Sequence, residues 1–248
     1  MSATEETVTE SASKYKSWLD GSHPLLERFK LLAPASFKHC QNVASMADAV
    51  ANELPEVDRE LLKVAAIFHD VGKVMNPDHF IENQNGSDNP HDDLDPHVSY
   101  HLITRHVSDS AALLAQHHCS PEVIDIVLQH HGSTVVKYFY RVSKAKDDEA
   151  YRYKWDAPQS VEAAILLVTD VVEAAARSMH ESGKLDALEG GRAEFVENFV
   201  KDLEEDGQLD NIRVRVLKAI KRVLPRELDA LFHKRIDYPE EERPSSDG

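Results

Sequence analysis

The most constraining stretch of this sequence is residues 65–73, where an apolar run ends in His69-Asp70 and is followed by Gly72 and Lys73. The run predicts a helix that comes from the protein interior and ends in two polar side chains. Because adjacent helical side chains point about 100° apart, His69 and Asp70 diverge, which suits a site with more than one metal ion. Lys73 lies three residues after Asp70, on the same side of the helix, where its charge suits an anionic substrate oxygen. A solvated helix end with a chance His-Asp pair is the alternative, and for two residues alone it is the better one.

A second apolar helix is predicted to end in the same way. Ser120-Pro121 is a strong helix start, since serine caps the first turn and proline fits its first position. The apolar residues that follow lead to His130-His131, and Gly132 is predicted to stop the helix. The sequence therefore delivers two pairs of possible ligands at two helix ends.

Three further helices are predicted to carry a polar side chain on an apolar face. His39 lies on an apolar stripe, His106 can face inward, and Asp170 interrupts the nearly apolar residues 161–172. A core histidine with satisfied hydrogen bonds is the alternative for His39. A buried carboxylate, in contrast, is costly unless it is paired or binds a metal ion.

Together these helices supply seven candidate metal ligands, each of which would otherwise carry a desolvation penalty: His39, His69, Asp70, His106, His130, His131 and Asp170. Imidazole and carboxylate groups without a thiolate suit Mn, Fe, Zn, Co or Ni. Seven ligands are too many for one tetrahedral ion and suit two.

The composition favours an all-α domain. The chain has 248 residues with few glycines, and it has neither a secretory signal nor an apolar run of roughly 18 residues that could span a membrane. We expect a tail at residues 1–20, one domain at 21–238 and a second tail at 239–248. The net charge of −16 argues against duplex nucleic acid as a partner. Two cysteines without a signal peptide indicate reduced thiols and a cytoplasmic location.

Substrate contacts are expected from three side chains and one loop. Besides Lys73, Arg105 is a candidate partner for a phosphate, and Tyr138 belongs to an aromatic cluster, 138–140, that could stack on a base. Core packing is the alternative for that cluster. The irregular residues 76–96 are expected to form a lid or a substrate loop, because loops of that length are usually functional or disordered.

Several separated motifs resemble those of the HD-domain phosphohydrolases. The resemblance is closer still to the cytoplasmic HD domain of the seven-transmembrane HD proteins, which degrade cyclic di-AMP. It covers roughly residues 23–239 and rests on these segments: His-Pro-Leu-Leu at 23–26, His-Asp-Val-Gly-Lys at 69–73, Glu-Asn-Gln at 82–84, Asn-Pro-His-Asp at 89–92, His-His-Gly-Ser-Thr at 130–134, Tyr-Phe-Tyr at 138–140, Asp170 with 172–175, Gly-Gln-Leu-Asp at 207–210 and Arg-Ile-Asp-Tyr-Pro at 235–239.

The resemblance implies a single helical bundle with a dinuclear centre between its helices. One ion would be held by His39, His69, Asp70 and Asp170, and the other by Asp70, His106, His130 and His131. Mn or Fe would be the expected metals. Two such ions activate a water molecule for in-line attack on phosphorus, Lys73 would stabilise the developing charge, and a cyclic dinucleotide would be opened to a linear one.

The chain departs from that family in two respects, and two other functions remain open. It lacks the membrane segments of the family, and Lys154-Trp155-Asp156-Ala157 replaces an expected Pro/Gly-rich segment. The alternatives are an HD phosphohydrolase that acts on another nucleotide and a non-catalytic sensor that binds a nucleotide in the same pocket. Partner proteins are not predicted.

Overall fold

A computed structural model of the chain describes residues 14–84 and 89–232. Within this part the protein is all-α, as predicted, and its only β-type pairing is an isolated bridge between Val135 and Arg152. None of the described helices combines the length and hydropathy of a membrane span. The α-helices are α2 (Pro24–Leu32), α3 (Pro34–Ala51), α4 (Arg59–Phe68), α5 (Pro96–Gln116), α6 (Pro121–Leu128), α7 (Lys137–Ser143), α8 (Val161–Glu181), α9 (Gly191–Glu205) and α10 (Val214–Phe232).

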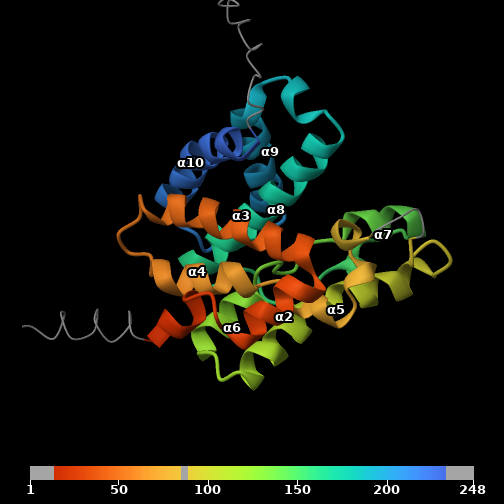
Figure 1. Ribbon diagram of the computed structural model, residues 1–248. Coiled ribbons are helices and arrows are strands. Elements are labelled where there is room, and N and C mark those ends of the chain that lie inside the picture. The colour runs from red at the N-terminus through yellow and green to blue at the C-terminus, as the bar shows by residue number, and fades with distance from the viewer. Residues whose placement is uncertain (1–13, 85–88, 233–248) are drawn as a thin grey trace, which may run out of the picture.

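Helix α3 is central to the bundle and packs against α4, α8 and α10 (Figure 1). Helix α8 is apolar almost all round between Ala163 and Val172, and these residues except Val171 are buried, as expected for a helix covered on nearly all sides. Its start is capped by Ser160, whose hydroxyl accepts a hydrogen bond from the Ala163 amide. Asp58 caps α4 in the same way. The two helices that carry carboxylates into the interior are therefore fixed at their first turns.

The chain leaves α4 through a tight 3-10 turn that packs directly on α5. This turn, η1 (Val71–Met75), follows His69 and Asp70. The Gly72 amide donates a hydrogen bond of 2.7 Å to Ser110 Oγ, and a Cβ atom at Gly72 would come within 3.0 Å of His106 O and Ser110 N. Glycine is therefore required here by the close approach of two backbones, and this approach sets Asp70 beside His106.

We expect Gly72→Ala to destabilise the protein by about 3 kcal/mol or more, since the clash is with backbone atoms that cannot turn aside. Urea unfolding of the purified variant measures this change. Gly183→Ala is the matched control, because a Cβ atom at Gly183 meets nothing within 4 Å and adds only left-handed backbone strain. Equal losses in the two variants would contradict the close-packing argument.

The predicted N-terminal tail is too long. Residues 14–19 are helical, and Tyr15 and Trp18 are buried, at 3% and 6% exposed. Trp18 stacks on the His23 ring at 4.0 Å and meets Phe68 edge-on at 5.3 Å. Trp18 thus attaches this segment to the end of α4, and Tyr15 attaches it to Ser120 through a hydrogen bond of 3.2 Å, although the composition of the segment is polar. Residues 1–13 and the predicted tail 239–248 lie outside the described residues.

The predicted loop at residues 76–96 is irregular but contains short turns. These are the 3-10 segments η2 (Pro77–His79) and η3 (Ile81–Asn83), whereas Pro96 already begins α5. Residues 85–88 lie outside the described residues. The first half of the segment lies against the buried core, since Phe80 and Asn83 are 6% and 9% exposed.

Candidate metal centre

The structure brings all seven predicted ligands together inside the bundle. His39 comes from α3, His106 from the middle of α5 and Asp170 from α8, while the two pairs follow the ends of α4 and α6. The side chain of His131 is 24% exposed, and those of the other six are 7% exposed or less. Two groups within the cluster have ligand atoms within 4.8 Å of one another: His39, His69 and Asp170, and His106, His130 and His131.

Asp70 lies between these two groups and faces one with each oxygen. Its Oδ2 is 3.9 Å from His39 Nε2 and 3.5 Å from His69 Nε2. Its Oδ1 is 3.2 Å from His106 Nε2 and 3.9 Å from His130 Nε2. A carboxylate in this position can bridge two cations. The second carboxylate, Asp170, is closer to the first group, with Oδ1 at 2.9 Å from His39 Nε2, while its Oδ2 lies 3.5 Å from His131 Nδ1 of the second group.

Backbone carbonyls fix three of the imidazole rings. The Nδ1–H groups of His69, His106 and His130 donate to the carbonyl oxygens three residues earlier, at 2.8, 2.7 and 2.5 Å. Each Nε2 therefore carries a lone pair that points into the cluster, which is the usual arrangement for metal-bound histidine.

The cluster has the polar atoms that a cation would satisfy. His106 Nε2 and His130 Nε2 face each other at 3.3 Å, although both carry lone pairs. His69 Nε2 and Asp70 Oδ1 are buried and have no hydrogen-bond partner, an arrangement that is costly in a protein interior. The donor set of imidazoles and carboxylates therefore fits divalent transition metal ions.

The charge states of three histidines favour the same conclusion, whereas burial of His69 is outweighed by Cys40 and Asp70, which raise the pKa of this ring. Burial lowers the pKa of His106, of His130 and of His131, the last to about 3, and so keeps these rings neutral at pH 7. Burial also opposes the charged form of His39, but hydrogen bonds to Asp170 and Glu173 outweigh it and raise the pKa of His39 to about 10. Burial acts to raise the pKa of Asp70, yet Lys73 and the nearby histidines hold it well below its usual range. A metal ion that binds His39 would therefore displace a proton.

Glu173 is a member of the site that the sequence analysis did not select. It is fully buried one turn after Asp170, and its Oε2 accepts a hydrogen bond from His39 Nδ1. Asn42 Nδ2 donates to its other oxygen at 2.8 Å. Glu173 thus orients His39 for coordination through Nε2. The available signal was a second carboxylate three residues after Asp170 within the apolar run.

Lys73 is enclosed rather than solvated. Its side chain is 12% exposed, and Nζ lies 2.7 Å from Asp70 Oδ2 and 2.7 Å from Glu82 Oε1. For Lys73, the alternative of a solvated helix end is therefore wrong. Glu82 was also not selected from the sequence, because its approach to Lys73 depends on how the loop after η1 folds back.

Arg105 and Tyr138 are not brought to the cluster. The Arg105 side chain is 61% exposed and pairs with Asp109 one turn later. Since adjacent helical side chains diverge, His106 takes the inward direction and Arg105 the outward one. Tyr138 is 65% exposed while its neighbour Phe139 is buried, so that core packing accounts for only part of the aromatic cluster.

Two hollows flank the ligands. One, of about 400 Å³, is lined by Asp70, Lys73, Glu82 and His106 among others. The other, of about 680 Å³, extends from His130 and His131 to α7 and α9. They share His131 and Val171.

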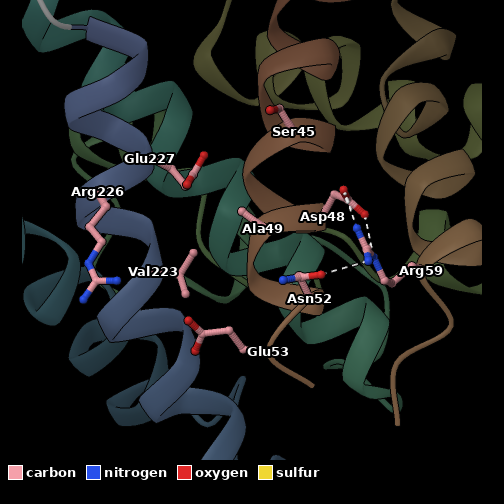
Figure 2. A pocket seen from close by; sticks show the side chains of 9 residues that line it. All are labelled: Ser45, Asp48, Ala49, Asn52, Glu53, Arg59, Val223, Arg226 and Glu227. Atoms are coloured by element: carbon pink, nitrogen blue, oxygen red, sulfur yellow. Dashed lines mark hydrogen bonds and ion pairs between the residues drawn. The ribbon is translucent and has the colours of Figure 1, made fainter. Parts of the chain in front are cut away.

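A third hollow, of about 440 Å³, lies between α3, α4 and α10 and has a different character (Figure 2). Its Asp48 carboxylate is paired with Arg59, which also donates to Asn52 at 3.0 Å. It contains no histidine. The metal cluster therefore marks the two flanking hollows as the candidate site.

Comparison with known proteins agrees with this geometry. A model of the HD domain matches residues 36–175. Cyclic-di-AMP phosphodiesterase PgpH of Listeria monocytogenes is 36% identical over 226 residues, and PgpH of Bacillus subtilis is 39% identical over 225 residues. These matches cover 89% and 88% of this chain but 31% of each relative, so the chain spans about a third of their length.

Two solved structures are also similar. The HD domain of L. monocytogenes PgpH aligns with a TM-score of 0.77 at 36% identity, which covers 86% of this chain and 100% of that one. The same domain in complex with cyclic-di-AMP aligns with a TM-score of 0.76, which covers 87% of this chain and 100% of that one. The relatives therefore align along nearly all of the bundle that surrounds the cluster.

Proposed function

Because this chain belongs to the HD domain family, we propose that it is a metal-dependent phosphodiesterase that hydrolyses cyclic di-AMP to the linear dinucleotide. The observation that carries the proposal is the position of Asp70, whose two oxygens face two separate groups of histidines. The names of the similar proteins support cyclic di-AMP as the substrate.

Two divalent ions, Mn or Fe, would be held by two sets of ligands that share Asp70. His39, His69 and Asp170 complete one set, and His106, His130 and His131 complete the other. When bound, such a pair lowers the pKa of a water molecule and neutralises charge on the phosphate oxygens. Zn, Co or Ni would suit the same donors.

The side chains of this protein would orient the ligands and the substrate. Glu173 holds the proton on His39 Nδ1, so that Nε2 is the nitrogen that would coordinate once its own proton is displaced. The ammonium of Lys73 lines the smaller hollow, where it can stabilise charge on a phosphoryl oxygen. Hollows on both sides of His131 and Val171 support a substrate with a nucleoside on each side of the scissile phosphate.

A substrate screen tests the proposal. Protein loaded with Mn or Fe is incubated with cyclic di-AMP, cyclic di-GMP, the corresponding linear dinucleotides and nucleoside monophosphates, and products are separated by chromatography. We expect cyclic di-AMP to give the linear dinucleotide with the highest kcat/KM. Faster hydrolysis of another nucleotide would reassign the substrate, and binding without turnover by metal-loaded protein would indicate a sensor.

We also propose a cytoplasmic location for this protein. Both cysteines, Cys40 and Cys119, are buried and free, which fits a reducing compartment. Measurement of free thiols in protein isolated under trapping conditions tests this placement.

Lys73→Ala should lower kcat by about 10²–10³, since one preorganised contact to the developing charge is lost. Metal content should stay near that of the unmodified protein, because an ammonium group does not bind a cation. Steady-state kinetics with cyclic di-AMP and elemental analysis measure the two effects. The control is Lys63→Ala on the outer face of α4, where the side chain is exposed. A change in kcat of less than about threefold would leave Lys73 without a role in the reaction, given the size of such contacts elsewhere.

A further inference from the structure

We propose that Glu82 is a positioning residue, which holds Lys73 in place beside the metal-bridging carboxylate Asp70 and directs its ammonium group toward the substrate phosphate. The inference rests on the proposed phosphodiesterase function and deepens it. It gives a role to the Glu-Asn-Gln segment at 82–84, which supplies none of the metal ligands.

Glu82 and its neighbour Asn83 are attached to the start of α3. The Ser36 hydroxyl donates a hydrogen bond of 2.8 Å to Glu82 Oε1 and accepts one of 2.8 Å from Asn83 Nδ2. The Ser36 amide donates to Asn83 Oδ1 at 3.3 Å. The first amides of a helix have no hydrogen-bond partner within the helix. The contact with Asn83 therefore gives the Ser36 amide an acceptor and, at the same time, fixes η3 to the start of α3. The position of Glu82 is therefore set by a helix and not by the loop alone.

The fixed carboxylate in turn holds Lys73. Glu82 Oε1 accepts a hydrogen bond of 2.7 Å from Lys73 Nζ, and Asp70 Oδ2 lies 2.7 Å from the same nitrogen. The Phe80 ring lies beneath the ammonium, at 4.8 Å from Nζ to the ring centroid. A continuous set of contacts thus runs from Ser36 through Glu82 and Lys73 to Asp70.

The number of donors explains how this arrangement can serve the reaction. An ammonium group has three N–H donors, and the two carboxylates take two of them. The third remains for the hollow that Lys73 and Glu82 line together. Because lysine has a long side chain with about 2 kcal/mol of rotamer entropy, two fixed acceptors preorganise a group that would otherwise be mobile.

Glu82 is ionised in this environment. Its side chain is 9% exposed, and burial acts to raise its pKa, but the ammonium of Lys73 outweighs burial and lowers the pKa of Glu82 to about 2. Glu82 also balances the positive charge of the Lys73 ammonium, which would lie close to the bound metal ions. The Asp70 carboxylate alone cannot balance this charge, since it would also bind the metal ions.

The test is a double-mutant cycle with the isosteric change Glu82→Gln. In protein with the native Lys73, we expect kcat for cyclic di-AMP to fall about tenfold or more, the usual effect of removing a group that orients a functional residue. Metal content, KM and melting temperature should change little. In the Lys73→Ala background the same change should have no further effect, because the residue through which Glu82 acts is gone.

Glu197→Gln is the matched control. Glu197 lies outside the candidate site, its side chain is 54% exposed, and it is one of two carboxylate partners of Lys221, the other being Glu204. This variant removes one negative charge and one partner of a lysine without touching Lys73, so kcat should stay within about twofold of the unmodified protein, as for most surface changes. An equal fall in Glu197→Gln and Glu82→Gln would assign the effect to net charge and overturn the positioning role.

A second readout does not depend on activity. Acetic anhydride labels lysine amines, and mass spectrometry gives the rate at Lys73. We expect faster labelling of Lys73 in Glu82→Gln, since the ammonium loses one of its two carboxylate partners, and an unchanged rate at the exposed Lys63. Unchanged labelling of Lys73, or an equal loss of kcat in both backgrounds, would overturn the inference. If the unmodified protein hydrolyses no cyclic dinucleotide, the proposed function fails, while the labelling result still decides whether Glu82 positions Lys73.

Discussion

Asp70→Ala is expected to abolish phosphodiester hydrolysis and to lower the occupancy of both metal ions. Asp70 Oδ2 faces His39 and His69, while Oδ1 faces His106 and His130. Loss of this carboxylate removes one ligand from each group, and it also removes the negative charge that two nearby cations share. Elemental analysis of protein purified without chelator, together with an assay on cyclic di-AMP, measures both effects.

Asp170→Ala is the control for the bridging position. Its Oδ1 lies closest to His39 Nε2 and His69 Nε2, at 2.9 and 3.6 Å, so we expect this variant to lose mainly one of the two ions. The informative quantity is the difference in metal content between Asp70→Ala and Asp170→Ala. Asp70→Ala protein that keeps about two metal ions per chain, the content of a complete dinuclear site, would show that Asp70 does not bridge.

The cluster of candidate ligands could be predicted from the sequence because each member interrupts an apolar pattern or follows its end. A histidine or aspartate on a stripe of buried residues has a desolvation penalty that demands a partner, so His39, His106 and Asp170 stand out without any knowledge of the fold. Hydrophobic periodicity also predicted the all-α architecture, since it reports which face of each helix is buried.

Residues whose position depends on tertiary contacts were harder to predict. Glu82 meets Lys73 only because η3 folds back onto the start of α3, a tertiary contact without a sequence period. Trp18 was assigned to a tail because its segment is polar, although a single large aromatic side chain is sufficient to attach it to Phe68. Local composition does not report such contacts.

Arg105 illustrates a different limit. Its charge made it a reasonable partner for a phosphate, but His106 beside it already takes the inward direction on α5. Within a helix, adjacent side chains point about 100° apart, and the sequence alone does not say which of the two the packing turns inward.

Removal of the metal ions is expected to lower the melting temperature by roughly 5–10 °C. The ligands come from α3, α5 and α8 and from the ends of α4 and α6, so bound ions link most of the bundle. A ligand that binds only the native state at 100 times its Kd adds about 2.7 kcal/mol, and for a chain of this length 1 kcal/mol corresponds to roughly 2–4 °C. Thermal unfolding followed by circular dichroism, with and without a strong chelator, measures the shift.

Two further measurements make this result specific to the cluster. Readdition of Mn or Fe should restore the melting temperature, whereas Mg should not, because Mg prefers oxygen ligands and keeps its water molecules. In Asp170→Ala protein the chelator should have a smaller effect, since fewer ions remain to be removed. Without metal, His106 Nε2 and His130 Nε2 lie 3.3 Å apart, so one of the two nitrogens must take up a proton if their lone pairs are not to repel each other. An unchanged melting curve in protein whose metal loss is confirmed by elemental analysis would contradict a metal site between these helices.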